Sequence, residues 1–160
     1  MLRKIAISVF LLLASGPASS GDFKRGDIAF VRGDYETAMR VWMADANKGN
    51  ASAQYNLGLM LENGLGVAAD FKEAIHWYVL AARQGHGRAQ NNLGALYAIG
   101  RGTLKDSLRA YMWWKIAVLS GVKTAAQNIR KIENTMSPMQ IAKAKEMAYE
   151  CIVKKSLAGC

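Results

Sequence analysis

The sequence is poor in the residues that bind metals. Its 160 residues include two cysteines, Cys151 and Cys160, and two histidines, His76 and His86. Zinc sites need several such side chains at short spacings, and neither histidine stands at ligand spacing from a cysteine. Neither histidine has a carboxylate or serine partner at a predictable spacing either. We therefore expect no bound metal, no cofactor and no histidine-based active site.

The sequence also lacks an apolar run long enough to span a membrane. The run from Ile5 to Ala14 has about half of the roughly 20 residues that a spanning helix needs. Arg3 and Lys4 precede this run and small residues around Ser20 follow it, which is the layout of a secretory signal peptide. We expect residues 1–20 to be removed, the mature protein to be exported to the periplasm or secreted, and no stable membrane insertion. A retained membrane anchor is the alternative.

Export would place the two cysteines in an oxidising compartment. An even number of cysteines near one end of an exported chain predicts a disulfide rather than a metal site. A bridge between Cys151 and Cys160 would close a short loop, worth about 2–3 kcal/mol in the chain-entropy model. We expect this bridge to pin the C-terminus.

Acidic residues are scarce in the second half of the chain. Residues 89–160 hold eleven basic and four acidic side chains, whereas residues 22–88 hold eight of each. The formal charge is +9, and removal of Arg3 and Lys4 with the signal peptide lowers it by two to +7. An exported protein rarely meets nucleic acid, so the excess favours an acidic protein or an anionic envelope component as the partner. The alternative is an ordinary solvated face.

Glycines are frequent and recur at a fixed distance. Residues 57–70 and 93–106 both set a Leu-Gly pair before a Gly-x-Gly and end on Asp. A shift of 36 residues superimposes these stretches, and such a period is typical of stacked supersecondary units. The residues in register, which we expect to be structural, are Leu57 and Leu93, Gly58 and Gly94, Gly64 and Gly100, Gly66 and Gly102, Asp70 and Asp106, Ala74 and Ala110, Trp77 and Trp113, and Gly85 and Gly121.

Each unit has the apolar spacing of two helices. Apolar residues fall three and four positions apart in both halves of the unit, which predicts a helix hairpin. Asp70 is expected to cap the second helix, with Glu73 completing a capping box. The predicted bounds are 53–63 and 89–99 for helix A and 71–84 and 107–120 for helix B.

The glycines between these helices are predicted to be joints. Glycine takes the left-handed conformation that ends a helix at no side-chain cost. The stretch from Gly64 to Ala69 also fits a G-x-G-x-x-A dinucleotide pattern. That pattern requires a preceding strand and an acidic residue about 20 positions on, and this sequence offers neither.

Two glycines lie inside helix A instead. Gly58 and Gly94 each cost about 1 kcal/mol relative to alanine at a helical position. We expect a close approach of the paired helix B, through Ala74, Ala81 and Ala117, to compensate for this cost.

The repeated motifs resemble a known family. The unit at 53–88 is similar to the Sel-1-like repeat (SLR), a subclass of the tetratricopeptide-like α-solenoids. The similarity lies in three motifs: Ala53-Gln-x-x-Leu57-Gly58, Gly64-x-Gly66-Val67-x-x-Asp70 and Ala74-x-x-Trp77-Tyr78-x-x-Ala81-Ala82-x-x-Gly85. The second copy departs at Thr103, Trp114 and Val118. The resemblance implies an all-α fold, a right-handed solenoid of stacked antiparallel helix hairpins.

The resemblance divides the chain into a repeat domain and a cap. The repeat domain covers 22–136, and 137–160 are expected to form a C-terminal capping helix and tail. Ser137-Pro-Met-Gln140 reads as the start of that helix, with Ser at the cap and Gln closing the box. The units are predicted at 22–52, 53–88, 89–124 and, in part, 125–136.

Two short motifs offer other functions. Ser120-x-x-Lys123 matches the nucleophile pattern of penicillin-recognising enzymes, and the SLR family includes secreted members linked with β-lactam hydrolysis. No S-D-N or K-T-G sequence accompanies it. Arg-Gly-Asp occurs at 25–27 and 32–34, at helix and turn positions of the first unit rather than in a protruding loop. The alternative function is a cell-wall or β-lactam-related enzyme or a small-ligand-binding protein.

The resemblance implies that a partner binds the concave side, which helix A lines. We expect a non-catalytic scaffold or adaptor of the bacterial envelope, a monomer that binds another, acidic, protein and no nucleic acid. The partner-binding residues assigned by register are Tyr55, Leu59, Glu62, Asn63, Asn91, Ala95, Ala98, Ile99, Gln127, Lys131 and Asn134.

Overall fold

A computed structural model describes residues 20–153 of the chain, and their side chains from residue 24 onward. The expected signal peptide and Cys160 lie outside these residues, so cleavage and the disulfide stay predictions. The described residues form eight α-helices and no strand: α1 (Ser20–Val31), α2 (Tyr35–Asn47), α3 (Ala51–Asn63), α4 (Phe71–Arg83), α5 (Gly87–Ile99), α6 (Ser107–Leu119), α7 (Lys123–Glu133) and α8 (Pro138–Val153).

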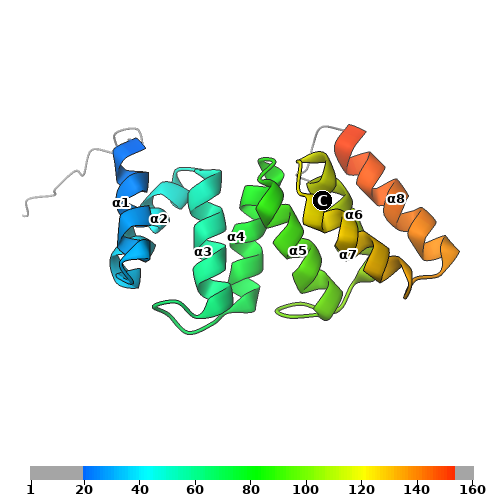
Figure 1. Ribbon diagram of the computed structural model, residues 1–160, viewed down its shortest axis with the longest axis horizontal. Helices are drawn as coiled ribbons and strands as arrows, with labels where there is room; N and C mark the ends of the chain where they lie inside the picture. The colour runs from blue at the N-terminus through cyan, green and yellow to red at the C-terminus, as the bar shows by residue number, and fades with distance from the viewer. Residues whose placement is uncertain (1–19, 154–160) are drawn as a thin grey trace, which may run out of the picture.

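The helices pack as a row of hairpins along the long axis of the molecule (Figure 1). We call α1, α3, α5 and α7 helices A, and α2, α4 and α6 helices B. Each helix A of the first three hairpins packs against its own helix B, and each helix B also packs against the next helix A. The last helix, α8, packs against α6 and covers the C-terminal end of the row. The predicted all-α solenoid with a capping helix is confirmed.

Two helices A begin two residues earlier than expected, because polar side chains cap them there. The Ala53 N–H donates to Asn50 Oδ1 at 2.9 Å at the start of α3. The Ala89 N–H donates to His86 Nδ1 at 3.3 Å at the start of α5. An N-cap acceptor satisfies one of the free amides of the first turn, which fixes where the helix starts. His86 is thus the counterpart of Asn50.

The capping box expected at Asp70 forms only in half. The Glu73 N–H donates to Asp70 Oδ1 at 3.0 Å, as predicted. The reciprocal bond from the Asp70 N–H to the Glu73 side chain is absent, because the Asp70 N–H donates to the Leu61 carbonyl at 2.9 Å. The full box forms instead at the start of α8, where Ser137 and Gln140 each bind the other's backbone N–H.

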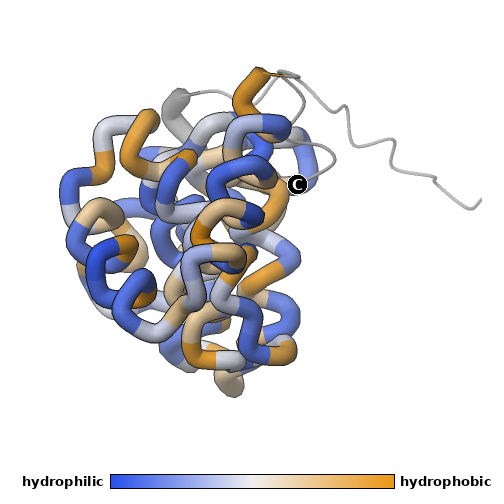
Figure 2. Tube along the Cα trace, turned by 90° about the vertical axis from the view of Figure 1, so that its right-hand side faces the viewer, coloured by the Kyte–Doolittle hydropathy of each residue, from blue (hydrophilic) through white to orange (hydrophobic). Residues whose placement is uncertain are grey.

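The core lies between the helix layers and runs along the whole row. In the end-on view of Figure 2, hydrophobic and hydrophilic residues follow one another along the helical trace, as expected of amphipathic helices. Each helix B contributes a buried tryptophan: Trp42 in α2, Trp77 in α4 and Trp113 in α6. Buried alanines fill the space between the rings. Ala144, Ala148 and Cys151 of α8 are also buried, so the capping helix extends the core.

The glycines inside helix A do not make room for the alanines of helix B, which corrects the expectation above. A Cβ atom on Gly58 would lie 2.5 Å from Cδ1 and Cε1 of the Tyr78 ring. A Cβ atom on Gly94 would lie 2.5 Å from Nε1 of Trp114. The glycine is needed because an aromatic ring of helix B lies flat against the helix A backbone. Gly26 repeats the arrangement in α1, against the indole of Trp42.

The second glycine of each hairpin loop lies against the preceding unit. A Cβ atom on Gly66 would lie 2.5 Å from Cβ of Tyr35, the first residue of α2. A Cβ atom on Gly102 would lie 2.5 Å from the carbonyl carbon of Phe71, the first residue of α4. Both glycines also have positive φ, at 72° and 71°. The loop of each unit is therefore fitted to the start of helix B of the unit before it.

Buried glutamines join neighbouring hairpins. The Gln90 amide donates to the Ala82 carbonyl of α4 at 3.0 Å and accepts from Ser120 Oγ at 2.8 Å. Gln54, one period earlier, donates to the Ala46 carbonyl of α2 at 3.1 Å and accepts from Gln84 Nε2 at 2.8 Å. We call each set a glutamine bridge. Each bridge ties one helix A to the ends of the helices B before and after it.

Candidate functional site

Three clefts open along the surface that the helices A form, which we call the helix A face. The N-terminal cleft lies between α1 and α3, and the C-terminal cleft lies between α5 and α7. The central cleft lies between them and reaches from α1 to the turn before α7. Asp27 and Asn56 line both the N-terminal and the central cleft, so these two are continuous.

The N-terminal cleft is apolar and has a volume of about 220 Å³. Phe30 and Val31 of α1 form one wall, and Leu59 of α3 forms the other. The Phe30 ring packs against the Trp42 ring, with centroids 5.3 Å apart, which fixes the floor. Val31 is 85% exposed although it is apolar.

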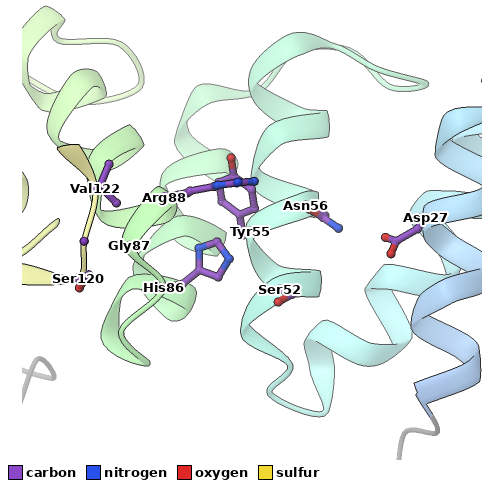
Figure 3. A pocket seen from close by; sticks show the side chains of 10 residues that line it. Asp27, Ser52, Tyr55, Asn56, His86, Gly87, Arg88, Ser120 and Val122 are labelled. Atoms are coloured by element: carbon purple, nitrogen blue, oxygen red, sulfur yellow. The ribbon is translucent and has the colours of Figure 1, made fainter. Parts of the chain in front are cut away.

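The central cleft is polar and is the largest of the three, with a volume of about 570 Å³ (Figure 3). Tyr55 of α3 stacks on His86, with ring centroids 4.5 Å apart and an angle of 27° between the planes. Arg88 points toward the same ring pair in Figure 3, and Asp27 lies at the opposite side of the cleft. The turn from Ser120 to Val122 closes the end nearest α7.

Burial and charge both disfavour a proton on His86. Burial under Tyr55 lowers the pKa of the imidazole below its usual value, and the positive charge of Arg88 lowers it further. The neutral ring also has a structural task, because a protonated Nδ1 cannot accept the Ala89 N–H. The neutral form is therefore the one that fits the folded state.

We predict that acidification weakens the fold through His86. The folded state holds the neutral ring, so this contribution to stability is complete above the unfolded pKa of about 6.5 and is lost as pH falls through the lower folded pKa. The expected loss is about 1 kcal/mol, the usual value of an N-cap bond. Urea unfolding of the parent and of His86→Asn at a series of pH values between about 7 and 5 measures it.

His86→Asn is the matched variant because Asn50 already serves as the cap at the equivalent position. It keeps an acceptor and removes the titrating group. The stability difference between parent and variant should therefore change with pH, in favour of the variant under acid conditions. A difference that stays constant over this range would contradict the prediction.

The C-terminal cleft is basic and has a volume of about 220 Å³. Lys105, from the loop before α6, and Lys131 of α7 stand on its rim. Trp114 forms the floor, and its Nε1 donates to the Asn91 carbonyl at 3.0 Å. Asn128 Nδ2 donates to Asn91 Oδ1 at 3.3 Å, which joins α7 to α5. Among the residues whose side chains are described, 24–153, no carboxylate lines this cleft.

The residues that the sequence assigned to the partner fall into two groups. Four of them line the clefts: Leu59 the N-terminal, Tyr55 the central, and Ala98 and Lys131 the C-terminal. The others line none of these three clefts, and several have contacts within the fold. Those others are Glu62, Asn63, Asn91, Ala95, Ile99, Gln127 and Asn134.

Several residues of that second group bind other residues of the fold. Glu62 Oε2 accepts from the Tyr78 hydroxyl at 2.5 Å, and Asn92 Nδ2 donates to the same hydroxyl at 3.1 Å. Burial and the Glu62 carboxylate together raise the pKa of Tyr78. Asn63 Nδ2 donates back to the Leu59 carbonyl at 2.8 Å. Ile99, Gln127 and Asn134 are exposed.

Sequence reasoning missed the contribution of α1. Asp27, Phe30 and Val31 line the N-terminal cleft, but α1 falls out of the 36-residue register, because Gly26 precedes Gly58 by 58 − 26 = 32 residues. A signal was present in the aromatic residues, since Trp42, Tyr78 and Trp114 are spaced by one period. A glycine precedes each of them, at Gly26, Gly58 and Gly94, and this series would have placed α1 as a helix A.

The short motifs that suggested other functions are used by the fold. Ser120, of the S-x-x-K match, is the C-cap of α6, and its hydroxyl donates a hydrogen bond to Oε1 of buried Gln90. In the first Arg-Gly-Asp, Gly26 lies against Trp42. In the second, Asp34 caps α2 by accepting the Thr37 N–H at 3.1 Å.

Within residues 20–153 no helix has both the length and the apolar character needed to cross a bilayer. The same residues bring together no group of three or more His, Cys, Asp or Glu side chains able to hold a metal ion.

Comparisons with known proteins agree with this geometry. Residues 51–86 and 87–122 each match the Sel1 repeat family. These matches cover α3 with α4 and α5 with α6. None of the curated proteins compared with the chain matches it.

Three solved structures are similar to the chain. A protective antigen present in uropathogenic Escherichia coli strains, displaying an SLR fold, is 29% identical with a TM-score of 0.81, over 88% of this chain and 31% of that one. A Sel1 repeat protein from Oxalobacter formigenes is 32% identical with a TM-score of 0.64, over 67% of this chain and 44% of that one. Cysteine-rich protein B of Helicobacter pylori shares the fold at 19% identity and a TM-score of 0.58, over 66% of this chain and 82% of that one. The chain thus spans less than half the length of the first two.

Proposed function

We propose that this protein, a solenoid with two Sel1 repeats, is a non-catalytic scaffold that binds another protein along its helix A face. Proteins built from Sel1 repeats are generally protein-interaction scaffolds. The observation that carries the proposal is the row of three clefts between successive helices A. Clefts repeated at each unit suit an extended partner that contacts several units in turn.

The scaffold acts in the bacterial envelope or outside the cell. Support comes from the charged start, short apolar run and small residues of 1–20, which have the layout of an export signal. Mass spectrometry of the protein from its native host should find an N-terminus at Gly21. An intact N-terminus at Met1 would contradict export by cleavage.

Site-specific photo-crosslinking tests the binding face. A photoreactive residue at position 59 or 98 lies in a cleft, whereas one at His76 lies on the exposed side of a helix B. In envelope extract, the cleft positions should crosslink one discrete protein and position 76 should not. Equal crosslinking from all three positions, or from position 76 alone, would contradict the proposal.

The partner is acidic and is steered by the basic second half of the chain. We predict that Lys131→Glu slows association several-fold, up to about tenfold at low salt, with the fold intact, because it reverses a charge on the rim of the C-terminal cleft. Stopped-flow or surface-plasmon measurement of the association rate with the captured partner checks this. Raising the ionic strength should shrink the difference, since salt screens the field.

Lys115→Glu is the matched control. It makes the same change in net charge on α6, at an exposed position that lines none of the three clefts. It should slow association much less than Lys131→Glu. An equal effect of the two variants would indicate that net charge, and not the cleft, governs the rate.

A further inference from the structure

The two ends of the helix A face differ in chemistry. At one end, the N-terminal cleft presents Phe30, Val31 and Leu59, with the Asp27 carboxylate at its edge. At the other end, the C-terminal cleft presents the ammonium groups of Lys105 and Lys131. A partner laid along the face would therefore meet an apolar surface beside a negative charge first, and two positive charges last.

The apolar end favours a hydrophobic side chain and disfavours an acidic one. Val31 is 85% exposed, and burial of apolar surface contributes about 25 cal/mol per Å². The floor is already rigid, because the Phe30 ring packs on both Trp42 and Tyr35, with centroids 5.3 and 5.5 Å away. A carboxylate placed here would lie near Asp27 and would be repelled.

The basic end favours a carboxylate. Among residues 24–153, neither Lys105 nor Lys131 has an ion-pair partner, so both charges are available to a ligand. The cleft between them also offers the hydroxyl group of Ser107, whereas the Thr135 hydroxyl already donates to the Ile132 carbonyl at 2.8 Å. Its floor is held by the bond from Trp114 to Asn91, so it is preformed rather than assembled on binding.

The distance between these ends sets the spacing of the two features in the partner. The N-terminal cleft lies between α1 and α3 and the C-terminal cleft between α5 and α7, so two helix-to-helix steps separate them. Successive helices A are joined mainly through the helix B between them, which packs on both. Packed helices lie about 8–10 Å apart, so one step from helix A to helix A is about 10–20 Å and two steps are about 20–40 Å. An extended chain rises about 3.3 Å per residue, so about six to twelve residues cover this distance.

We propose that the partner presents an extended segment with an apolar side chain at one end and one or two carboxylates about six to twelve residues away. The apolar side chain enters the N-terminal cleft and the carboxylates meet Lys105 and Lys131. Between them, the backbone of the segment crosses the central cleft, past Tyr55 and Arg88. This inference rests on the proposed function and adds the chemistry and the orientation of the bound segment.

A library of random 16-residue peptides displayed on phage tests the inference. The chain from residue 21 onward should select peptides with an acidic residue or pair about six to twelve positions from a large apolar residue. The double variant Lys105→Glu with Lys131→Glu should select basic residues at the same spacing. Peptides selected by the parent should bind this variant at least about tenfold more weakly in fluorescence anisotropy, as expected from reversing two partly exposed charges.

Two control variants test the roles of net charge and of the apolar contact. The double variant Lys115→Glu with Lys145→Glu changes the net charge equally at exposed positions that line none of the clefts, and it should select the same peptides as the parent. Leu59→Asp should remove the preference for the apolar residue. Circular dichroism and melting curves establish that each variant is folded.

The outcomes separate this inference from the proposed function. Peptides that compete with the crosslinked partner but lack the acidic and apolar spacing would overturn the inference and leave the scaffold function standing. The same consensus from the parent and from the Lys105 and Lys131 variant would also overturn it. Failure to select any peptide, together with no crosslink from the clefts, would overturn both.

Discussion

Gly58→Val is expected to lower the free energy of unfolding by about 2–4 kcal/mol, far more than an average change on a helix surface. The reason is steric. Even the first carbon of the new side chain would lie 2.5 Å from two atoms of the Tyr78 ring, which is fully buried and has no room to move. Branching at Cβ adds further overlap and a lower helix propensity. Urea or thermal unfolding measures the effect.

The clash can be separated from helix propensity with alanine. At an exposed helical position, Gly→Ala raises the free energy of unfolding by about 1 kcal/mol. If Gly58→Ala lowers it instead, the clash with the Tyr78 ring outweighs the gain in helix propensity. In a Tyr78→Ala background the same change should become neutral or stabilising. Lys72→Val, at an exposed position of α4, is the control for branching alone and should cost well under 1 kcal/mol. An unchanged melting temperature for Gly58→Val would contradict the packing described here.

Gln90→Glu is expected to have a comparable or larger effect, about 3–5 kcal/mol at neutral pH. The side chain is fully buried, and its amide nitrogen donates to the Ala82 carbonyl. A carboxylate of the same shape would place a buried negative charge against that carbonyl oxygen, with only the Ser120 hydroxyl left to stabilise it.

The pH dependence identifies the cause. Burial should raise the pKa of the introduced carboxyl group in the folded state above its unfolded value of about 4.3. The penalty is then absent below about pH 4.3, grows as pH rises toward the folded pKa, and is constant above it. The difference in unfolding free energy from the parent should therefore shrink on acidification.

Gln90→Leu is the neutral control. It removes both hydrogen bonds without a charge, and the Ala82 carbonyl keeps the Gly85 N–H as a donor at 3.0 Å. Its cost should be about 1–2 kcal/mol and should not vary with pH over this range. If Gln90→Glu behaves like Gln90→Leu at every pH, the bridge tolerates a charge and the account of its burial is wrong.

Most of the fold could be predicted because the repeat sets it. A 36-residue period with helical spacing fixes the hairpins, and the glycines after α3 and α5 do end those helices in the left-handed conformation, with φ of 66° at Gly64 and 73° at Gly100. The side chain that packs on Gly58 could not be predicted in the same way. Periodicity shows on which face of its helix a residue lies, but not which residue of the neighbouring helix contacts it. The alanines and Tyr78 share one helix, and only the packed structure shows that the ring is the part in contact.

The helix A face was predictable only in part. The register placed Leu59 and Lys131 on it, and both line clefts. It could not separate exposed positions that line a cleft from those that bind their own neighbours, such as Glu62 on Tyr78. Such bonds depend on side-chain conformation across helices, which a sequence period does not encode.

The backward fit of the hairpin loops has a consequence for how the chain is assembled. Gly66 lies against Tyr35 and Gly102 against Phe71, so each loop packs against a helix B that precedes it in the chain. A ribosome delivers the N-terminal end first, and so does a translocation channel. When a new hairpin emerges, the preceding hairpin on which its loop packs has therefore already been made. A hairpin made in isolation lacks that surface. Synthesis from the N-terminus and the packing of each hairpin on the one before it thus follow the same order, from α1 toward α8.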